Sequence, residues 1–189
     1  KVEIDAVCHT IDGDLGFQVT YDGGRDGTIR CTGTAKTDRE FRTCRTGFVI
    51  LHPLAGVVGK PMKVEHVDGG IEQAVIPEHI VSDQPFLLVR AMTHEPMPGV
   101  SATIRMEGDS WETEDHRNWT DASFKTYCRP LSLPWPYTIP AGGEVRRYDV
   151  LHRTIYKYST PVERSTHLLR LFPAHDRLQT VRGGAVNVS

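Results

Sequence analysis

The stretch Leu15-Gly-Phe-Gln-Val-Thr-Tyr alternates apolar and polar side chains and ends at Asp22-Gly-Gly. A second alternating stretch, Gly27-Thr-Ile-Arg-Cys-Thr-Gly, follows almost at once. Alternation with a period of two places every second side chain on the same face of a β-strand, and Gly and Asp are common in tight turns. The sequence therefore predicts a β-hairpin whose turn lies across residues 22–27.

The same pattern continues along the rest of the chain. Short β-prone runs alternate with Gly, Asp and Pro, and the further runs begin at Gly47, Met62, Gln73, Pro85 and Val100. No amphipathic helix separates these runs, and strands that follow one another without crossover helices are typical of antiparallel sheets. We therefore expect an all-β fold, an antiparallel β-sandwich-like domain with little or no helix.

Length and composition limit the class of protein. The chain has 189 residues, of which 39% are apolar and 24% are charged, which suits one globular domain or one domain plus a fragment. It contains neither a run of 18 apolar residues nor a charged-then-apolar leader. We expect a soluble, cytoplasmic protein that does not bind membranes. The start at Lys1, inside an alternating stretch and without Met, suggests that an upstream segment is missing.

Motifs for metals and cofactors are not found in the sequence. The four cysteines contain no Cys-x-x-Cys pair, and the nine histidines show neither His-x-His nor His-Glu-x-x-His spacing. A phosphate-binding loop and a dinucleotide fingerprint are also missing. The sequence therefore predicts no metal site and no cofactor, and we expect the cysteines to be free thiols packed among strands.

Composition changes near residue 146. The segment 130–143 contains four prolines and two glycines, as expected of extended chain outside a central sheet. Residues 1–145 carry a net charge of −7 and residues 146–189 carry +5. The basic groups of the second part are interleaved with apolar ones, and Tyr148 to Tyr158 alternate, which predicts a strand and no nucleic-acid binding. We therefore expect two regions, 1–145 and 146–189.

The densest polar constellation lies in residues 112–127. If residues 111–117 form a strand, one face holds Asp115 and Arg117 and the other holds Glu112, Glu114 and His116. Acids beside cations and amides can supply a general base, an orienting group and a cation for a developing oxyanion. The alternative is a solvated loop held by Asp–Arg and Asx hydrogen bonds, and the residue types leave both open.

Several stretches resemble the D-apionate lactonase family in order and spacing. They are Arg45-Thr-Gly-Phe-Val-Ile-Leu-His-Pro-Leu-Ala-Gly, Val64-Glu-His-Val-Asp-Gly, Gln84-Pro-Phe, Met106-Glu-Gly-Asp and Glu114-Asp-His-Arg-Asn-Trp-Thr-Asp-Ala-Ser-Phe-Lys-Thr-Tyr. The resemblance spans roughly residues 10–145. It implies a bacterial sugar-acid lactone hydrolase, in which a β-rich region precedes a larger barrel-type region. His116 stands where the family's Glu-Asp-Gln-Arg-Asn-Trp stretch has Gln.

A second resemblance covers roughly residues 147–181. Tyr148-Asp-Val-Leu-His-Arg-Thr-Ile-Tyr-Lys-Tyr-Ser-Thr-Pro-Val and Ser165-Thr-His-Leu-Leu-Arg-Leu-Phe-Pro look like the opening of the N-terminal β-domain of bacterial transglutaminase-like proteins. In that family a Cys-His-Asp catalytic domain follows. The change in charge and the change in resemblance coincide near residue 146, which suggests that two truncated β segments have been joined.

The leading hypothesis is a partial sugar-acid lactone hydrolase of carbohydrate catabolism with little activity as an isolated chain. Lactone hydrolysis needs an activated water and a stabilised oxyanion. The predicted catalytic groups, proton acceptors first and cations second, are Glu114, Asp115, Arg117 and Lys125. The predicted groups that bind the sugar-acid lactone or carbohydrate are Asn118, Asp121 and Tyr127. The alternatives are a non-catalytic carbohydrate-binding or assembly module, and the N-terminal segment of a transglutaminase-like protein.

Overall fold

The fold was analysed in a computed structural model that describes residues 2–10, 13–142, 144–157 and 179–186. The expectation of an all-β, antiparallel fold is confirmed, because every strand pairing is antiparallel and the helical structure is a single short 3₁₀ turn, η1 (His116–Trp119), in the described part of the chain. The strands are β1 (Val2–Thr10), β2 (Gly13–Gly23), β3 (Thr28–Lys36), β4 (Phe41–Thr43), β5 (Val49–Pro53), β6 (Pro61–His66), β7 (Ile71–Val75), β8 (Phe86–Met97), β9 (Val100–Glu107), β10 (Trp111–Asp115), β11 (Ser123–Tyr127), β12 (Tyr137–Ile139), β13 (Glu144–Tyr156) and β14 (Gln179–Val186).

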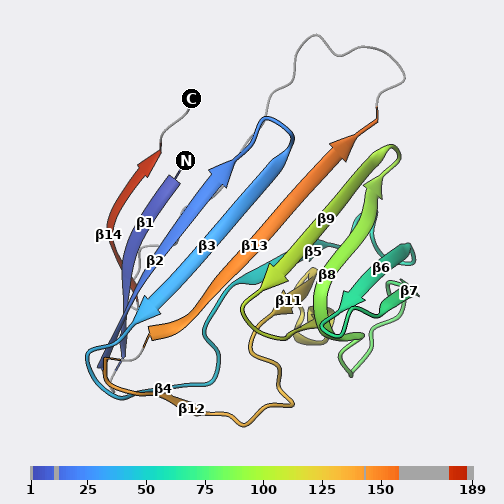
Figure 1. The fold of residues 1–189 in the computed structure, drawn as a ribbon. Coiled ribbons are helices and arrows are strands. Elements are labelled where there is room, and N and C mark those ends of the chain that lie inside the picture. The colour runs from blue at the N-terminus through green and yellow to red at the C-terminus, as the bar shows by residue number, and fades with distance from the viewer. Residues whose placement is uncertain (1, 11–12, 143, 158–178, 187–189) are drawn as a thin grey trace.

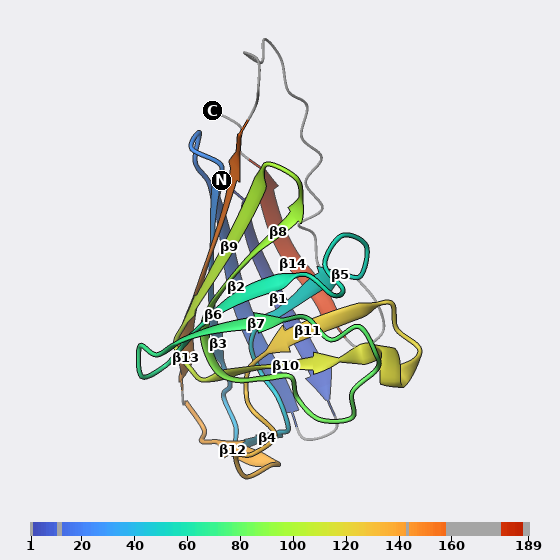
Figure 2. The same ribbon diagram turned by 90° about the vertical axis from the view of Figure 1, so that its right-hand side faces the viewer.

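Most strands belong to one strongly curled sheet. Its order is β14-β1-β2-β3-β13-β9-β8-β10-β11-β5, with β6 and β7 branching from β8, while β4 and β12 form a separate small pair. Five long strands, β1, β2, β3, β13 and β9, run side by side in this order in Figure 1. Figure 2 shows β6, β7, β10 and β11 running across the direction of β9 and β13. The curl thus encloses a core between long and short strands of the same sheet.

The expected hairpin forms where the sequence predicts it. β2 and β3 pair from Gly16–Lys36 to Gly23–Ile29. Inside the turn, the Gly24 amide donates to the Thr28 carbonyl over 2.7 Å. Gly27 has φ +77°, and a Cβ there would lie 2.5 Å from the Thr154 carbonyl oxygen of β13. A side chain at this position is therefore excluded both by the backbone conformation and by the neighbouring strand.

The strand predicted from Tyr148 is confirmed as far as Tyr156, within β13. Tyr158 and the stretch 165–173 lie outside the described residues. β13 lies between β3 and β9 near the middle of the sheet, and the expected boundary between residues 145 and 146 falls inside this strand. The division into regions 1–145 and 146–189 stays a prediction.

The core lies on the inner side of the curl. Val57, Val64, Val89 and Trp111 have no exposed surface there. β8 joins the two strand directions, because it pairs with β9 and β6 along its second half and with β10 near its start. Leu88, with φ +51°, lies at this change of partner. Side chains from both parts of the sheet therefore pack into one hydrophobic cluster.

Histidines occupy part of this interior. The rings of His52 and His94 meet edge to face with centroids 6.0 Å apart, and Nδ1 of His94 is buried without a hydrogen-bond partner. His52 Nε2 lies 2.8 Å from Thr126 Oγ1. Burial, together with repulsion from His94 and His152, lowers the pKa of His52 to about 4. These histidines are therefore held in the neutral form at neutral pH.

Candidate active site

The predicted site residues lie at one corner of the sheet, on β10, η1 and β11, beside β5 (Figure 2). β10 ends at Asp115, so residues 116 and 117 belong to η1 and do not continue the strand. Across the outer face of this corner, Glu114 pairs with Lys125 and Lys125 pairs with Leu51. The Asp115 side chain lies on the opposite, buried face with 0% exposure. Strand alternation thus divides the constellation between two sides of one sheet.

On the buried side, Asp115 and Arg117 form a closely bonded pair. Arg117 donates from Nε to Asp115 Oδ1 over 2.8 Å and from Nη2 to Oδ2 over 2.7 Å. The backbone amides of Arg117 and Val81 donate to the same carboxylate. Burial alone would raise the pKa of Asp115, but these hydrogen bonds outweigh it and hold the pKa below its usual value. Both carboxylate oxygens therefore have partners within the protein.

Arg117 and Asn118 also bind the loop between β7 and β8. The Arg117 guanidinium donates to the carbonyls of Pro77, Glu78 and His79 at 2.8–3.1 Å. Asn118 Nδ2 donates to the Val81 carbonyl. These contacts give Asp115, Arg117 and Asn118 a structural role, because they join η1 to a segment more than 30 residues earlier in the chain. Their predicted part in chemistry or substrate binding stays a prediction.

The outer side carries a different group of side chains. A hollow of about 170 Å³, named here the outer hollow, has Arg45, Val49, His116, Lys125 and Tyr127 among its lining residues. At roughly 30 Å³ for each water in the liquid, its volume corresponds to about six water molecules. This volume accommodates a small ring compound.

A carboxylate and an imidazole meet beside the outer hollow. His116 Nε2 lies 3.2 Å from Glu114 Oε2, and Trp119 Nε1 donates to Glu114 Oε1 over 3.2 Å. Arg45 Nη1 approaches Glu114 Oε2 at 4.0 Å, and Lys125 Nζ forms an ion pair with Asp121. Because an ionised carboxylate only accepts, His116 donates from Nε2, and Nδ1 is then the nitrogen that can take a proton.

Tyr127 is oriented by a buried acid. Its hydroxyl donates to Glu112 Oε1 over 2.6 Å, and the Leu131 amide donates to the same oxygen over 2.8 Å. Burial and the hydrogen bond to Glu112 raise the pKa of Tyr127. The Arg45 guanidinium lies 4.0 Å from the centroid of the Tyr127 ring. Tyr127 therefore serves as a fixed platform under Arg45, with its hydroxyl directed into the protein.

The structure brings together three of the predicted site residues, Glu114, Lys125 and Tyr127, and separates them from Asp115, Arg117 and Asn118. Asp121 joins the outer group through Lys125. Sequence reasoning assigned no role to His116 or Arg45, although both stand in the quoted motifs. Only the fold brings Arg45 onto Tyr127, since the two are far apart in sequence. Among the described residues no group of three or more His, Cys, Asp or Glu side chains could hold a metal ion.

Comparison with known proteins gives the family of this chain. The chain belongs to the D-apionate lactonase N-terminal domain family, whose model matches residues 1–153. It is 56% identical over 138 residues to a D-apionate lactonase of Brucella anthropi. This alignment covers 73% of the chain and 23% of that relative, so the chain spans about a quarter of the relative's length.

Residues 148–189 match the bacterial transglutaminase-like N-terminal region, so both resemblances expected from the sequence are confirmed. No solved structure matches the chain. In the part of the chain that the structure describes, no helix is long and apolar enough to cross a membrane.

Proposed function

We propose that this chain is the β-domain of a sugar-acid lactone hydrolase and that its outer hollow holds the groups that act on the lactone. Family membership and the relative named D-apionate lactonase support the reaction class. The observation that carries the proposal is the contact between Glu114 and His116, with Lys125 and Arg45 close by. In ester hydrolysis a base can activate the attacking water, and cations can stabilise the developing oxyanion.

The chemistry follows from these positions. Glu114, held by His116 and Trp119, takes a proton from water as the water oxygen attacks the lactone carbonyl carbon. Negative charge develops on the carbonyl oxygen, and Lys125 or Arg45 stabilises it. When the tetrahedral intermediate collapses, the ring carbon–oxygen bond breaks and the protonated Glu114 returns its proton to the leaving alkoxide. The product is the open-chain hydroxy acid.

We expect slow turnover by the chain alone. The hollow is open and small, and charge stabilisation by fixed groups is strongest where water is excluded. In a full-length lactonase, the part of the polypeptide not spanned by this chain would supply a second wall. The proposed activity in that setting is sugar-acid lactone hydrolysis in carbohydrate catabolism.

A hydrolysis assay with a sugar γ-lactone tests this proposal. Glu114→Gln removes the carboxylate that accepts the proton, so we expect it to abolish any turnover above background. His116→Gln should keep turnover, because Gln still donates to Glu114 and is the residue of the resembling family stretch at this position. Glu40→Gln is the matched control, because Glu40 is an exposed acid outside the outer hollow. Wild-type turnover that survives Glu114→Gln, or that falls equally in Glu40→Gln, would contradict the assignment.

The contacts in the outer hollow favour this function over a purely carbohydrate-binding or assembly module. A module that only binds needs no imidazole in contact with a carboxylate beside two cations. If the wild-type chain binds the lactone without any turnover, and the same holds after addition of the remaining part of a full-length lactonase, the binding module becomes the better description. The match of residues 148–189 to the transglutaminase-like N-terminal region does not point to a reaction, so we propose no function from it.

A further inference from the structure

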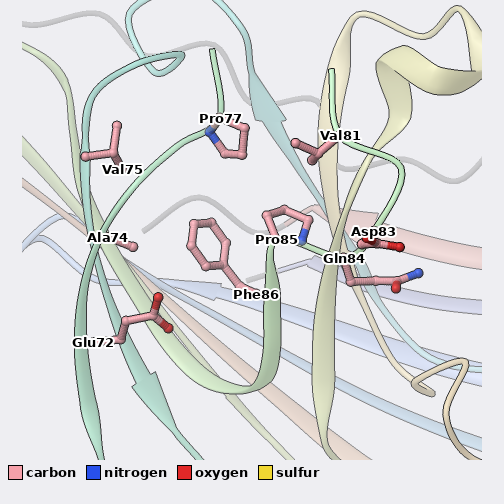
Figure 3. A pocket seen from close by; sticks show the side chains of 9 residues that line it. All are labelled: Glu72, Ala74, Val75, Pro77, Val81, Asp83, Gln84, Pro85 and Phe86. Carbon is pink, nitrogen blue, oxygen red and sulfur yellow. The ribbon is translucent and has the colours of Figure 1, made fainter. Parts of the chain in front are cut away.

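We propose that a second cavity, between β7 and the loop leading into β8, binds a neutral polyhydroxylated small molecule and excludes the corresponding carboxylate anion. The cavity has a volume of about 460 Å³, within the range of small-molecule sites (Figure 3). It shares no lining residue with the outer hollow. The inference therefore goes beyond the proposed hydrolysis and does not depend on it.

The polar lining of this cavity consists of two carboxylates and one amide. Glu72 on β7 and Asp83 in the loop contribute carboxylates, and Gln84 contributes an amide. In Figure 3 the Glu72 carboxylate lies near the Phe86 ring, while Asp83 and Gln84 lie on the other side of that ring. The described lining residues include no Lys, Arg or His. Sugar hydroxyls can donate to the carboxylates, whereas a ligand carboxylate would meet two like charges.

The apolar lining suits the carbon skeleton of such a ligand. Phe86 is 4% exposed and forms part of the cavity surface with Pro77, Pro85 and Val75. Figure 3 places the Phe86 ring at the centre of the lining residues. An apolar surface with a few convergent polar groups is the usual composition of a small-molecule site.

One wall of the cavity is fixed by hydrogen bonds from η1. Pro77 and Val81 line the cavity, and their backbones accept hydrogen bonds from Arg117 and Asn118. Opposite them, Glu72 Oε2 lies 3.1 Å from His66 Nε2, which orients the carboxylate. Both sides of the cavity are thus held before any ligand enters, and a preformed site loses less entropy on binding.

The test is a titration of the purified chain with ribono-1,4-lactone and with ribonate, followed through backbone amide signals by NMR. These probes share a carbon skeleton and differ in charge. We expect the lactone to shift signals of residues 72–86, and ribonate to bind about ten-fold more weakly at low ionic strength, with a smaller difference at about 0.5 M salt.

Variants separate the cavity from the general charge of the surface. In the double variant Glu72→Gln with Asp83→Asn, ribonate should bind nearly as well as the lactone. Glu78→Gln is the matched control, since Glu78 is an exposed acid of the same loop outside the cavity lining, and it should leave the ten-fold preference unchanged.

Three results from the titrations of the wild type would overturn the inference. They are a lactone that shifts no signal in residues 72–86, shifts confined to the outer hollow, and ribonate binding as tightly as the lactone to the wild type. An effect of Glu78→Gln equal to that of the double variant would overturn it as well. Hydrolysis by the Glu114 and His116 pair is measured separately, so failure of one proposal leaves the other testable.

Discussion

The two faces of the corner formed by β10, η1 and β11 carry similar acidic and basic residues, which differ in their exposure to solvent. On the inner face, Asp115 is fully buried and its partner Arg117 has a side chain that is 13% exposed. On the outer face, Lys125 and Asp121 form an ion pair whose side chains are 21% and 47% exposed. Desolvated charges need complete hydrogen bonding, whereas exposed charges are compensated by water. The inner pair therefore holds the loop in place, and the outer groups remain available for a ligand.

The largest expected effect of this difference concerns Arg117→Ala. The substitution leaves the buried Asp115 carboxylate without its cation, which typically costs about 3–5 kcal/mol. For a chain of this size we expect thermal melting to fall by roughly 10 °C or more. Lys125→Ala is the control on the outer face and should cost at most about 1 kcal/mol. Equal losses in the two variants, measured by thermal melts, would remove the distinction between the faces.

The buried histidines predict acid sensitivity of the inner side. His52 has a folded-state pKa of about 4, below the ordinary value of 6.5, so the unfolded state binds more protons between these two pH values. Stability is therefore full above pH 6.5 and falls as the pH drops toward 4, by about 3 kcal/mol from His52 alone. Urea unfolding at several pH values measures this loss. His52→Gln should flatten the dependence, whereas His9→Gln, which changes an exposed histidine, should not.

A smaller effect is expected at Tyr127, which lies on the outer face but directs its hydroxyl to Glu112. Tyr127→Phe removes one donor to a buried carboxylate, and the expected cost is about 1–2 kcal/mol. The Leu131 amide still donates to the same oxygen, which limits the loss. Denaturant unfolding gives the value. A change within experimental error would show that water replaces the hydroxyl and that this position behaves as exposed.

The smallest effect on stability is expected at Trp119, whose side chain is 69% exposed. Trp119→Phe keeps an aromatic ring but removes the N–H that donates to Glu114. We expect a change in the free energy of unfolding below about 0.5 kcal/mol, with a several-fold loss of lactone hydrolysis because Glu114 is held less firmly. Thermal melts and the hydrolysis assay test the two parts. A large loss of stability would show that Trp119 has a structural role like that of Asp115 and Arg117.

Much of the local structure could be predicted from the sequence. The hairpin across residues 22–27 and the strand from Tyr148 follow from alternation and turn residues, which act over a few positions. The order of strands could not be predicted, because β13 pairs with β3 and β9, which come from far earlier in the chain. The strand considered for residues 111–117 ends earlier, at Asp115. The Asp115 side chain accepts a hydrogen bond from the Arg117 amide and starts η1.

The candidate site was only partly predictable for the same reason. The polar segment 112–127 singled out in the sequence contains Glu114 and His116, which the structure places in contact. The contact of Arg45 with Tyr127, and the binding of residues 77–81 by Arg117 and Asn118, join parts of the chain 37 or more residues apart. No local pattern encodes such contacts, so the part played by each polar group depended on the fold.

By itself, the sequence determined the all-β class, the family and the fact that Glu114 and Asp115 point to opposite faces of β10, since side chains alternate along a strand. The tertiary structure decided which of those faces is inside. The curl of the sheet at β8 turns the Asp115 face toward the core, where Asp115 has no exposed surface, whereas the Glu114 side chain on the other face is 16% exposed. Burial then sets the chemistry, because a carboxylate removed from water must be fully bonded by the protein, whereas one at the surface can still meet a ligand.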